Sequence, residues 1–332
     1  MSLSRRALFT LEFERPPDAI DRLVRVHRTA MACRVEIALP EEDTTDVAAA
    51  RAALDEADRV EALLSIYRDS SELSRVNREG AAGAEGVDPE VVALLEACER
   101  RHAETDGAFD ITSSPLSRCW GFLYREARVP SDAEIAAARS LVGMHLVDID
   151  AASRSVRFAR PGVSVNFNAV GKGYALDRMG AVLRAHGVRQ ALLSAGGSSV
   201  VAIGARRGGW PIDIRSPLVA KARLGRVRLR DGALGTSGQG EQFIVTDGER
   251  PVRYGHVIDP RSGWPASGVL SCSVIASDAA TADALSTAFL VGGPELARRY
   301  CGEHPNTLAL VTADDGSETP QVFGRFKGAD LE

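Results

Sequence analysis

Segments with strand character follow one another in runs along this chain, and helical segments separate the runs. Residues 190–229, for example, hold four short apolar segments in succession without a helical pattern between them. A doubly wound sheet would instead alternate single strands with helices, because each parallel strand needs a long crossover connection. The order of segments therefore predicts an α+β fold with mixed or antiparallel sheets that are flanked by helices.

Helices are expected where apolar side chains recur at a spacing of three to four residues, and strands where short apolar runs lie between turn residues. The expected helices cover residues 45–64, 89–105, 116–123, 131–140, 170–186, 279–290 and 294–300. The expected strands cover residues 145–149, 155–158, 163–165, 190–193, 200–203, 211–214, 224–229, 243–245, 269–276 and 308–311, with one or two more within 24–39. Residues 65–86 are polar and are expected to be irregular.

The length of 332 residues suits one large domain or two modest ones. No linker, internal repeat or composition change marks a boundary inside the chain. We therefore expect residues 1–20 to form a flexible N-terminal arm, ending at Pro16-Pro17, and residues 21–332 to form a single domain.

Charge and composition exclude several kinds of partner. The net charge of −5 argues against a nucleic-acid surface, and no stretch approaches the ~20 apolar residues of a membrane span. The five cysteines are scattered and form no C-x-x-C pair, which is typical of reduced thiols. Charged residues interrupt the N-terminal segment before an apolar export signal can form. A cytoplasmic protein is expected.

The densest chemical signal lies in residues 255–263 and 281–288. Asp283 and Thr287 are four residues apart, so a helix places both side-chain oxygens on one face. One carboxylate and one hydroxyl suit Mg²⁺, which keeps open positions for phosphate oxygens. The alternative is an aspartate placed for the helix dipole with an incidental threonine.

Residues 166–174 join an expected strand to an expected helix and contain Lys172. Small residues there allow a ligand to approach the backbone, the helix N-terminus favours anions, and a lysine adds a compact positive charge. The spacing is not that of a Walker loop. The alternative is a tight turn with a solvated lysine.

Three further places carry candidate residues. Phe109 and Asp110 lie beside a flexible turn, although such a phenylalanine is more often a core residue and such an aspartate more often a helix cap. The polar segment 67–77 is long for a connector without function. His256 precedes Asp259-Pro260 and stands near the proposed metal helix, so a role as proton acceptor or donor is plausible, whereas most loop histidines are solvated.

Taken in order, these segments resemble the ApbE-type family, the FAD:protein FMN transferases. The resemblance covers roughly residue 31 to the end of the chain. The matching segments are residues 65–77, 107–122, 169–177, 195–197, 236–238, 256–263 and 282–288.

The resemblance implies an α+β fold that binds FAD and Mg²⁺, cleaves the flavin diphosphate, and moves the FMN phosphoryl group onto a Thr or Ser hydroxyl of an acceptor flavoprotein. AMP is released. It implies that the backbone carbonyl of Ala169, the carboxylate of Asp283 and the hydroxyl of Thr287 hold the metal. His256 is the candidate for proton handling, and Lys172 neutralises phosphate charge. The residues implied to contact the flavin and its diphosphate are Met31, Tyr67, Ala108, Phe109, Asp110, Asn166, Lys172 and Ile258.

The chain departs from the family pattern at three points. Met31-Ala32-Cys33 replaces Met-Gly-Thr, Asn166-Phe167-Asn168 replaces Asp-Leu-Gly, and Ser198-Ser199 follows the double glycine in place of an Asp and an apolar residue. Two other functions therefore stay open. One is an FAD diphosphatase that yields FMN and AMP, and the other is a flavin-binding protein without catalytic activity.

Overall fold

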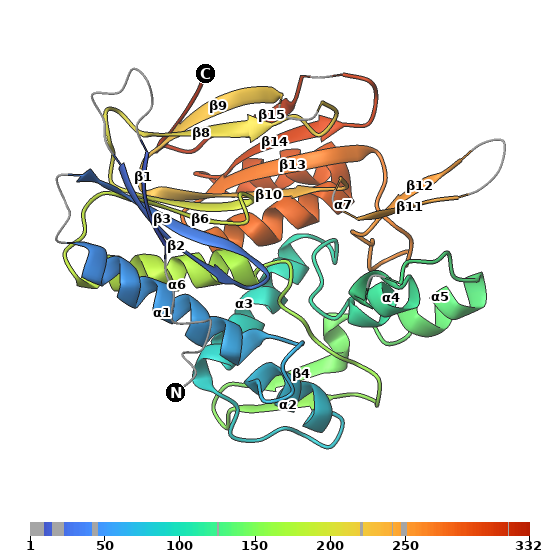
Figure 1. The fold of residues 1–332 in the computed structure, drawn as a ribbon. Helices are drawn as coiled ribbons and strands as arrows, with labels where there is room; N and C mark the ends of the chain where they lie inside the picture. Colours follow the sequence, from blue (N-terminus) through green and yellow to red (C-terminus); the bar gives the residue numbers. More distant parts are fainter. Residues whose placement is uncertain are drawn as a thin grey trace.

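A nine-stranded antiparallel sheet forms the centre of the protein in this computed structural model (Figure 1). The structure describes residues 10–14, 23–41, 46–124, 126–219, 222–240, 242–246, 251–317 and 319–332. The strand order is β1-β2-β3-β6-β7-β10-β13-β14-β15. These strands are β1 (Thr10–Glu14), β2 (Leu23–Ala30), β3 (Cys33–Pro40), β6 (Ala191–Ala195), β7 (Ser199–Ile203), β10 (Gly232–Gly238), β13 (Val269–Ala276), β14 (Leu308–Ala313) and β15 (Gln321–Gly324).

Helices cover one face of this sheet, and a second sheet covers the other (Figure 1). The helices are α1 (Val47–Leu64), α6 (Gly171–Ala185) and α7 (Ala279–Glu303). The second sheet has three strands, in the order β16-β9-β8, and these are β8 (Trp210–Arg215), β9 (Arg223–Leu229) and β16 (Ala329–Leu331). Side chains along β7 point alternately to the two faces of the sheet, so Val201 packs toward the helices and Val200 toward the second sheet. The large sheet is thus covered by an apolar layer on each face.

Smaller elements pack beside these layers and complete the domain (Figure 1). The helices are α2 (Glu72–Glu79), α3 (Pro89–Glu104), α4 (Ser114–Cys119) and α5 (Asp132–Arg139), with short 3₁₀ turns at Phe122–Tyr124 and Met144–Leu146. Two hairpins form the remaining sheets: β4 (Val147–Asp150) with β5 (Ser155–Phe158), and β11 (Phe243–Val245) with β12 (Arg253–Gly255). The β11–β12 hairpin projects away from the body of the protein beside α4 and α5.

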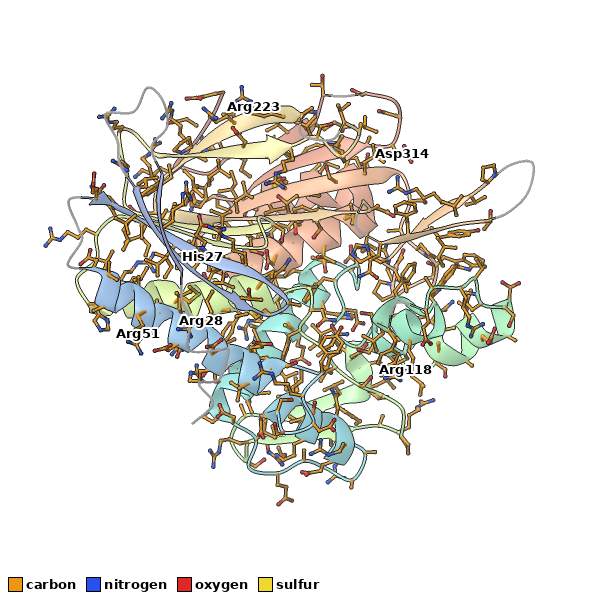
Figure 2. All side chains as sticks on the ribbon, in the orientation of Figure 1. His27, Arg28, Arg51, Arg118, Arg223 and Asp314 are labelled. Carbon is orange, nitrogen blue, oxygen red and sulfur yellow. The ribbon has the colours of Figure 1, made fainter. Side chains whose placement is uncertain are left out.

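Ion pairs attach the helices to the sheet and to one another. Arg28 reaches from β2 toward α1, where its Nη1 lies 2.8 Å from Asp55 and 2.5 Å from Asp58 (Figure 2). Arg28 is only 7% exposed, so the two carboxylates neutralise a positive charge that is largely shielded from water.

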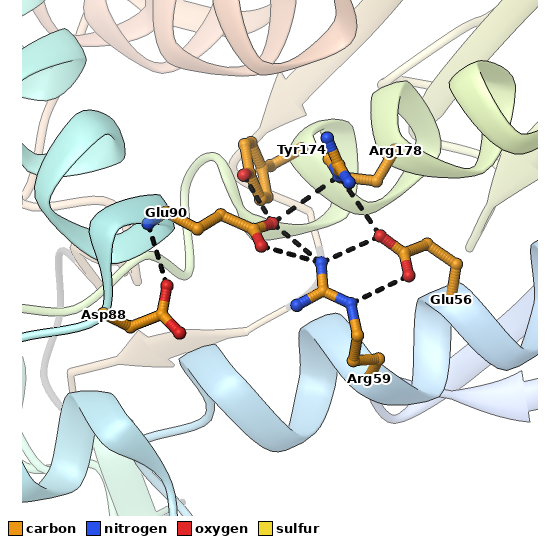
Figure 3. A network of polar contacts seen from close by, with 6 residues as sticks. All are labelled: Glu56, Arg59, Asp88, Glu90, Tyr174 and Arg178. Atoms are coloured by element: carbon orange, nitrogen blue, oxygen red, sulfur yellow. Dashed lines mark hydrogen bonds and ion pairs between the residues drawn. The ribbon is translucent and has the colours of Figure 1, made fainter.

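A second network joins α1, α3 and α6 (Figure 3). Arg59 of α1 donates to Glu56 of its own helix and to Glu90 of α3, at 2.8 Å in each case. Glu90 also accepts from the hydroxyl of Tyr174 on α6, at 2.6 Å, and Glu56 accepts from Arg178 on the same helix, at 3.1 Å. The three helices are therefore connected through two carboxylates.

The α+β expectation is confirmed, and most expected elements are present within a few residues. The division into an N-terminal arm and a single domain stays a prediction. Residues 10–14 of the expected arm form β1, and residues 1–9 and 15–20 lie outside the described residues. Within the described part of the chain, no helix is long and apolar enough to cross a membrane.

Several local expectations were wrong: β1, β10, β12, β15 and β16 were not expected as strands, and two other segments also differ. Residues 72–79 form α2, whose cap is the Ser71 hydroxyl accepting from Ser74 N at 3.0 Å, in a segment expected to be irregular. Residues 163–165 form no strand, because the Asn77 side-chain amide pairs with both backbone groups of Val165. β10 was missed because it is rich in small residues: a side chain at Gly235 would begin 2.6 Å from the backbone of α7.

Candidate active site

A cleft of about 560 Å³ opens where the ends of β6, β7, β10 and β13 meet the first turns of α6 and α7. The loops that precede α4 and α6, and the segment that follows β12, complete its walls. All of the proposed site residues except Met31 line this cleft. They are Tyr67, Ala108, Phe109, Asp110, Asn166, Ala169, Lys172, His256, Ile258, Asp283 and Thr287.

Met31 lies in the tight turn between β2 and β3, where its φ of 52° is in the left-handed region. Its side chain packs against the buried apolar residues that α1 and α6 cover. It also packs against a second buried cluster, to which α3, α7, β13 and β14 contribute. Its methyl carbon would be 3.4 Å from a side chain added at Gly171. A contact of Met31 with the flavin thus stays a prediction that the lining of the cleft does not support.

Asp283 stands in the second turn of α7 and is only 6% exposed. The Ser199 hydroxyl lies 2.8 Å from Asp283 Oδ1 and 2.9 Å from Oδ2, and the Gly173 N–H donates to Oδ2 at 2.8 Å. Burial raises the pKa of Asp283 to about 7, although the Ser199 hydroxyl and the charge of Lys172 both oppose that rise. The carboxylate is therefore held in place by β7 and α6 before any ligand binds.

The starts of α6 and α7 touch backbone to backbone. A side chain at Gly173 would begin 2.2 Å from the carbonyl oxygen of Ala279, so only glycine permits this approach. Asp177 of α6 accepts from the N–H groups of Ala279 and Ala280, at 2.8 and 2.9 Å. Burial raises the pKa of Asp177 to about 7, while these two N–H groups act against the rise. Asp177 thereby fixes the helix end that carries Asp283.

Thr287 lies one turn after Asp283 on the same face of α7, as the spacing predicts. Its hydroxyl is 3.0 Å from Ser237 Oγ at the end of β10 and 3.2 Å from the Asp283 carbonyl oxygen. Ala169, in the loop before α6, lines the same cleft. The Asp283 carboxylate, the Thr287 hydroxyl and the carbonyl of Ala169 therefore belong to residues that line one cleft, where they could serve together as metal ligands.

These donors fit Mg²⁺. The described residues contain no group of three or more His, Cys, Asp or Glu side chains that could hold a metal, so a softer, multi-ligand site of that kind is not formed here. Hard oxygen donors with few protein ligands are typical of Mg²⁺, whose remaining positions are filled by water and phosphate oxygens. The desolvated Asp283 carboxylate would also be stabilised by a nearby cation.

Lys172 lies in the first turn of α6, and its Nζ donates to the Ser198 hydroxyl at 2.6 Å. Ser198 is in the turn between β6 and β7, directly after the double glycine. The ammonium group thus points across the cleft from the helix N-terminus, where both the charge and the helix dipole favour an anion.

Asp110 and Asn166 are held by hydrogen bonds on another wall of the cleft. Asp110 Oδ1 accepts from the backbone N–H and the hydroxyl of Thr112, at 2.7 and 2.5 Å. Asp110 Oδ2 lies 3.3 Å from His102 Nδ1, and this contact raises the pKa of His102. Asn166 donates to the Ser114 hydroxyl at 2.5 Å. Both polar side chains are therefore fixed in orientation.

His256 follows β12 at the rim of the cleft. Its backbone N–H donates to the Gln242 carbonyl at 3.1 Å, its Nδ1 lies 3.3 Å from the same oxygen, and its ring meets Phe122 edge-on at 6.5 Å. Tyr67 stands elsewhere on the lining, 64% exposed, with its hydroxyl 3.4 Å from Asn168 Nδ2. An exposed ring of this kind offers a flat surface to an aromatic ligand.

Comparison with known protein families shows to which family this chain belongs. Residues 31–312 match the sequence profile of the ApbE family. This chain belongs to the ApbE family. The resemblance seen in the ordered motifs is thereby confirmed.

Individual ApbE relatives are moderately similar to the chain. The FAD:protein FMN transferase of Rhodobacter capsulatus is 34% identical over 267 residues, which are 78% of this chain and 50% of the relative. The FAD:protein FMN transferase of Vibrio cholerae is 32% identical over 262 residues, which are 76% of each protein. The chain therefore spans about half the length of the first relative and about three quarters of the second.

Solved ApbE structures share the fold. The ApbE protein of Thermotoga maritima superposes with a TM-score of 0.81 at 31% identity, covering 92% of this chain and 97% of the other. The flavin transferase ApbE of Vibrio cholerae superposes with a TM-score of 0.78 at 28% identity, covering 92% and 99%. The ApbE-like fold expected from the sequence is confirmed.

Three residues that position the site were missed from the sequence: Ser199 and Ser237 line the cleft, and Asp177 lies outside it. Ser199 and Ser237 hold Asp283 and Thr287, and Asp177 fixes the start of α7. Ser199 had one usable signal, because it follows the double glycine where the family has a different pair of residues. Asp177 and Ser237 had no signal beyond their motifs, since their contacts join segments that are far apart in the sequence.

Proposed function

We propose that this protein is a Mg²⁺-dependent FAD:protein FMN transferase. It binds FAD in the cleft, attaches FMN through a phosphoester to a Thr or Ser hydroxyl of an acceptor flavoprotein, and releases AMP. The names of the relatives support the reaction. The observation that carries the proposal is the buried Asp283 carboxylate, which shares one cleft with Thr287 and Lys172.

The metal would be held by the Ala169 carbonyl, the Asp283 carboxylate and the Thr287 hydroxyl. Bound Mg²⁺ supplies charge neutralisation at the diphosphate. Lys172 adds a second positive charge from the start of α6, and the Ser198 hydroxyl 2.6 Å away keeps that ammonium group pointed into the cleft. Phosphoryl transfer depends on positioning and electrostatic stabilisation more than on covalent chemistry, so this set of residues is suited to it.

FAD would lie along the walls that hold the fixed polar groups. Tyr67 and Phe109 offer ring faces, and Asp110 and Asn166 offer oriented hydrogen-bonding groups. Ala108 and Ile258 supply apolar contact. Because one carboxylate and two neutral oxygens bind Mg²⁺ weakly until the diphosphate adds its oxygens, we propose that metal and FAD bind together.

His256 would take the proton of the acceptor hydroxyl. The hydroxyl oxygen forms a bond to the FMN phosphorus, the bond between that phosphorus and the bridging oxygen breaks, and AMP leaves with the bridging oxygen. The position of His256 at the rim supports this role, because an acceptor protein must approach from outside.

One assay tests the proposal against the two alternatives. The protein is incubated with FAD, Mg²⁺ and a flavoprotein domain that carries an acceptor Thr, and the products are separated on a denaturing gel. A fluorescent band of the acceptor domain supports transfer. Free FMN without that band would indicate a diphosphatase, and unchanged FAD would indicate binding alone. Asp283→Ala should abolish the fluorescent band while circular dichroism stays that of the parent protein.

Two wider expectations belong to the same proposal. The scattered, unpaired cysteines favour a cytoplasmic protein, since all five are free thiols in the structure. The acceptor residue is expected to be Thr or Ser, because the transfer described above needs a hydroxyl oxygen.

A further inference from the structure

Large apolar side chains that are exposed to solvent gather around the mouth of the cleft. Leu218 and Val219, 47% and 50% exposed, follow the lining residue Pro217, and Phe243, 46% exposed, follows the lining residue Gln242. Exposed apolar side chains that stand singly are normal, but a set that borders one opening marks an interaction site.

The β11–β12 hairpin carries part of this border and has two different faces. Ile244 and Tyr254 are paired across the strands, and both pack against the aromatic and aliphatic cluster around Trp120. Side chains alternate along a strand, so the neighbours Phe243 and Val245 point to the opposite face, where they are 46% and 53% exposed. The inner face anchors the hairpin, and nothing among the described residues covers the outer face to the same extent.

We propose that the outer face of the β11–β12 hairpin, defined by Phe243 and Val245, is the docking surface for the acceptor flavoprotein. It binds an extended segment next to the acceptor Thr or Ser through apolar side chains of that segment. This inference rests on the proposed transfer function, because only that function brings a second protein to this cleft.

The connection of the hairpin to the chemistry supports this choice of partner. β12 continues directly into His256, and the residue before β11 is Gln242, whose carbonyl accepts from the His256 N–H. A polypeptide lying on the outer face would therefore have its neighbouring residues at the rim where the hydroxyl must enter. A small flavin ligand would gain nothing from this face, because Phe243 and Val245 do not line the cleft.

The chemistry of the face also indicates what it recognises. The Arg253 guanidinium lies 4.0 Å from the centre of the Phe243 ring, so the ring is held in place by a cation on the same face. A held aromatic ring beside the β-branched Val245 offers apolar area at low entropic cost, which is typical of residues that dominate binding in interfaces.

The test compares the double variant Phe243→Ser/Val245→Ser with Val322→Ser/Leu331→Ser. The control removes side chains of similar exposure, 49% and 44%, from β15 and β16. The probe is the flavin-free form of a flavoprotein domain that carries FMN on a Thr. Its Kd for each protein is measured by biolayer interferometry without FAD, and its KM and kcat are measured in the transfer assay.

We expect the hairpin variant to raise the Kd and the KM for the acceptor domain about tenfold or more, with kcat at saturating acceptor and the affinity for FAD unchanged. The control should match the parent protein. Equal Kd values for the parent and the hairpin variant would overturn the docking proposal, as would a parent protein that does not bind the acceptor domain. A parent protein that binds the domain but transfers no FMN would refute the proposed function instead, and the Kd comparison would still decide the docking surface.

Discussion

Asp283 is a carboxylate that the fold withdraws from water and surrounds with hydrogen-bond donors. Its pKa of about 7 in the metal-free protein lies above its ordinary value of about 3.8. A raised carboxyl pKa means that the contribution of this group to stability is fully present below pH 4 and is lost as the pH rises through 7. The buried Asp283 carboxyl group, which we propose as a metal ligand, therefore lowers the stability of the folded protein at neutral pH when no cation is bound.

Asp283→Asn should remove this pH dependence. In EDTA at pH 8 we expect the variant to be more stable than the parent protein by on the order of 2 kcal/mol, with the difference shrinking toward pH 4. Urea unfolding at several pH values measures it. Asp314→Asn, a change at an exposed carboxylate, is the control (Figure 2). A parent protein that gains stability on Asp283→Asn equally at pH 4 and pH 8 would contradict the argument.

Lys172→Ala should lower the rate of FMN transfer about 100-fold, because it removes a charge aimed at the departing phosphate. Lys327→Ala, a change at an exposed lysine, should leave the rate unchanged. The measurement is the initial rate of acceptor fluorescence at saturating FAD. A Lys172→Ala protein with the parental rate would remove this residue from the proposed mechanism.

At the scale of elements, the network of Figure 3 connects α6, which carries Lys172 in its first turn, to α1 and α3. Glu90→Ala removes the acceptor shared by Arg59 and Tyr174. Because the side chain of Arg59 is 43% exposed, we expect a loss of only about 1 kcal/mol in the free energy of unfolding, reduced further in 1 M salt. Glu295→Ala breaks an ion pair that is 84% exposed at the glutamate, and it should have little effect.

Helix α7 contains a break that its sequence requires. Gly293 has φ 72° and ψ −172°, a conformation that other residues adopt only under strain, and Pro294 follows it. Gly293→Ala should therefore destabilise the protein by about 1–3 kcal/mol. Gly302→Ala in the same helix should be neutral or stabilising by up to about 1 kcal/mol, since nothing lies within 4 Å of the added methyl group. Thermal unfolding of both variants distinguishes these outcomes, and equal losses would show that the break is not needed.

Most elements could be predicted because their apolar periodicity is local. Helix α1 and helix α3 show a clear stripe of buried residues, and the Ser131 capping box marks the start of α5. The elements that were missed depend on partners elsewhere. β10 is a central strand made largely of small residues because α7 packs closely on it, and α2 is only two turns long with a polar sequence.

The same limit applies to the site. Asp283 and Thr287 could be paired from the sequence because both lie on one helix. Ser199 could not be assigned to Asp283, nor Asp177 to the start of α7, because 84 and 102 residues separate the partners. Sequence spacing reports neighbours within one element, and only the packed fold brings distant elements together.

For the whole molecule, binding of Mg²⁺ and FAD should be interdependent. At saturation, the pair should raise the Tm by about 5 °C, because ligands that bind only the folded state stabilise it. Either ligand alone should raise it by less than about 2 °C, and EDTA should cancel the effect. Differential scanning fluorimetry measures these shifts, with Asp283→Ala as the control that responds to neither. A full shift with FAD in EDTA would show that the metal is not required for binding.

The two groups that hold the Asp283 carboxylate also bear on the order of events during synthesis. The carboxylate needs the amide of Gly173 and the hydroxyl of Ser199, which leave the ribosome more than eighty residues earlier. A nascent chain that lacks α7 has these two groups but not Asp283 itself, so the proposed binding site for FAD is incomplete. Under the proposed function, flavin binding is therefore a marker of completed folding, and a product truncated before α7 should remain colourless.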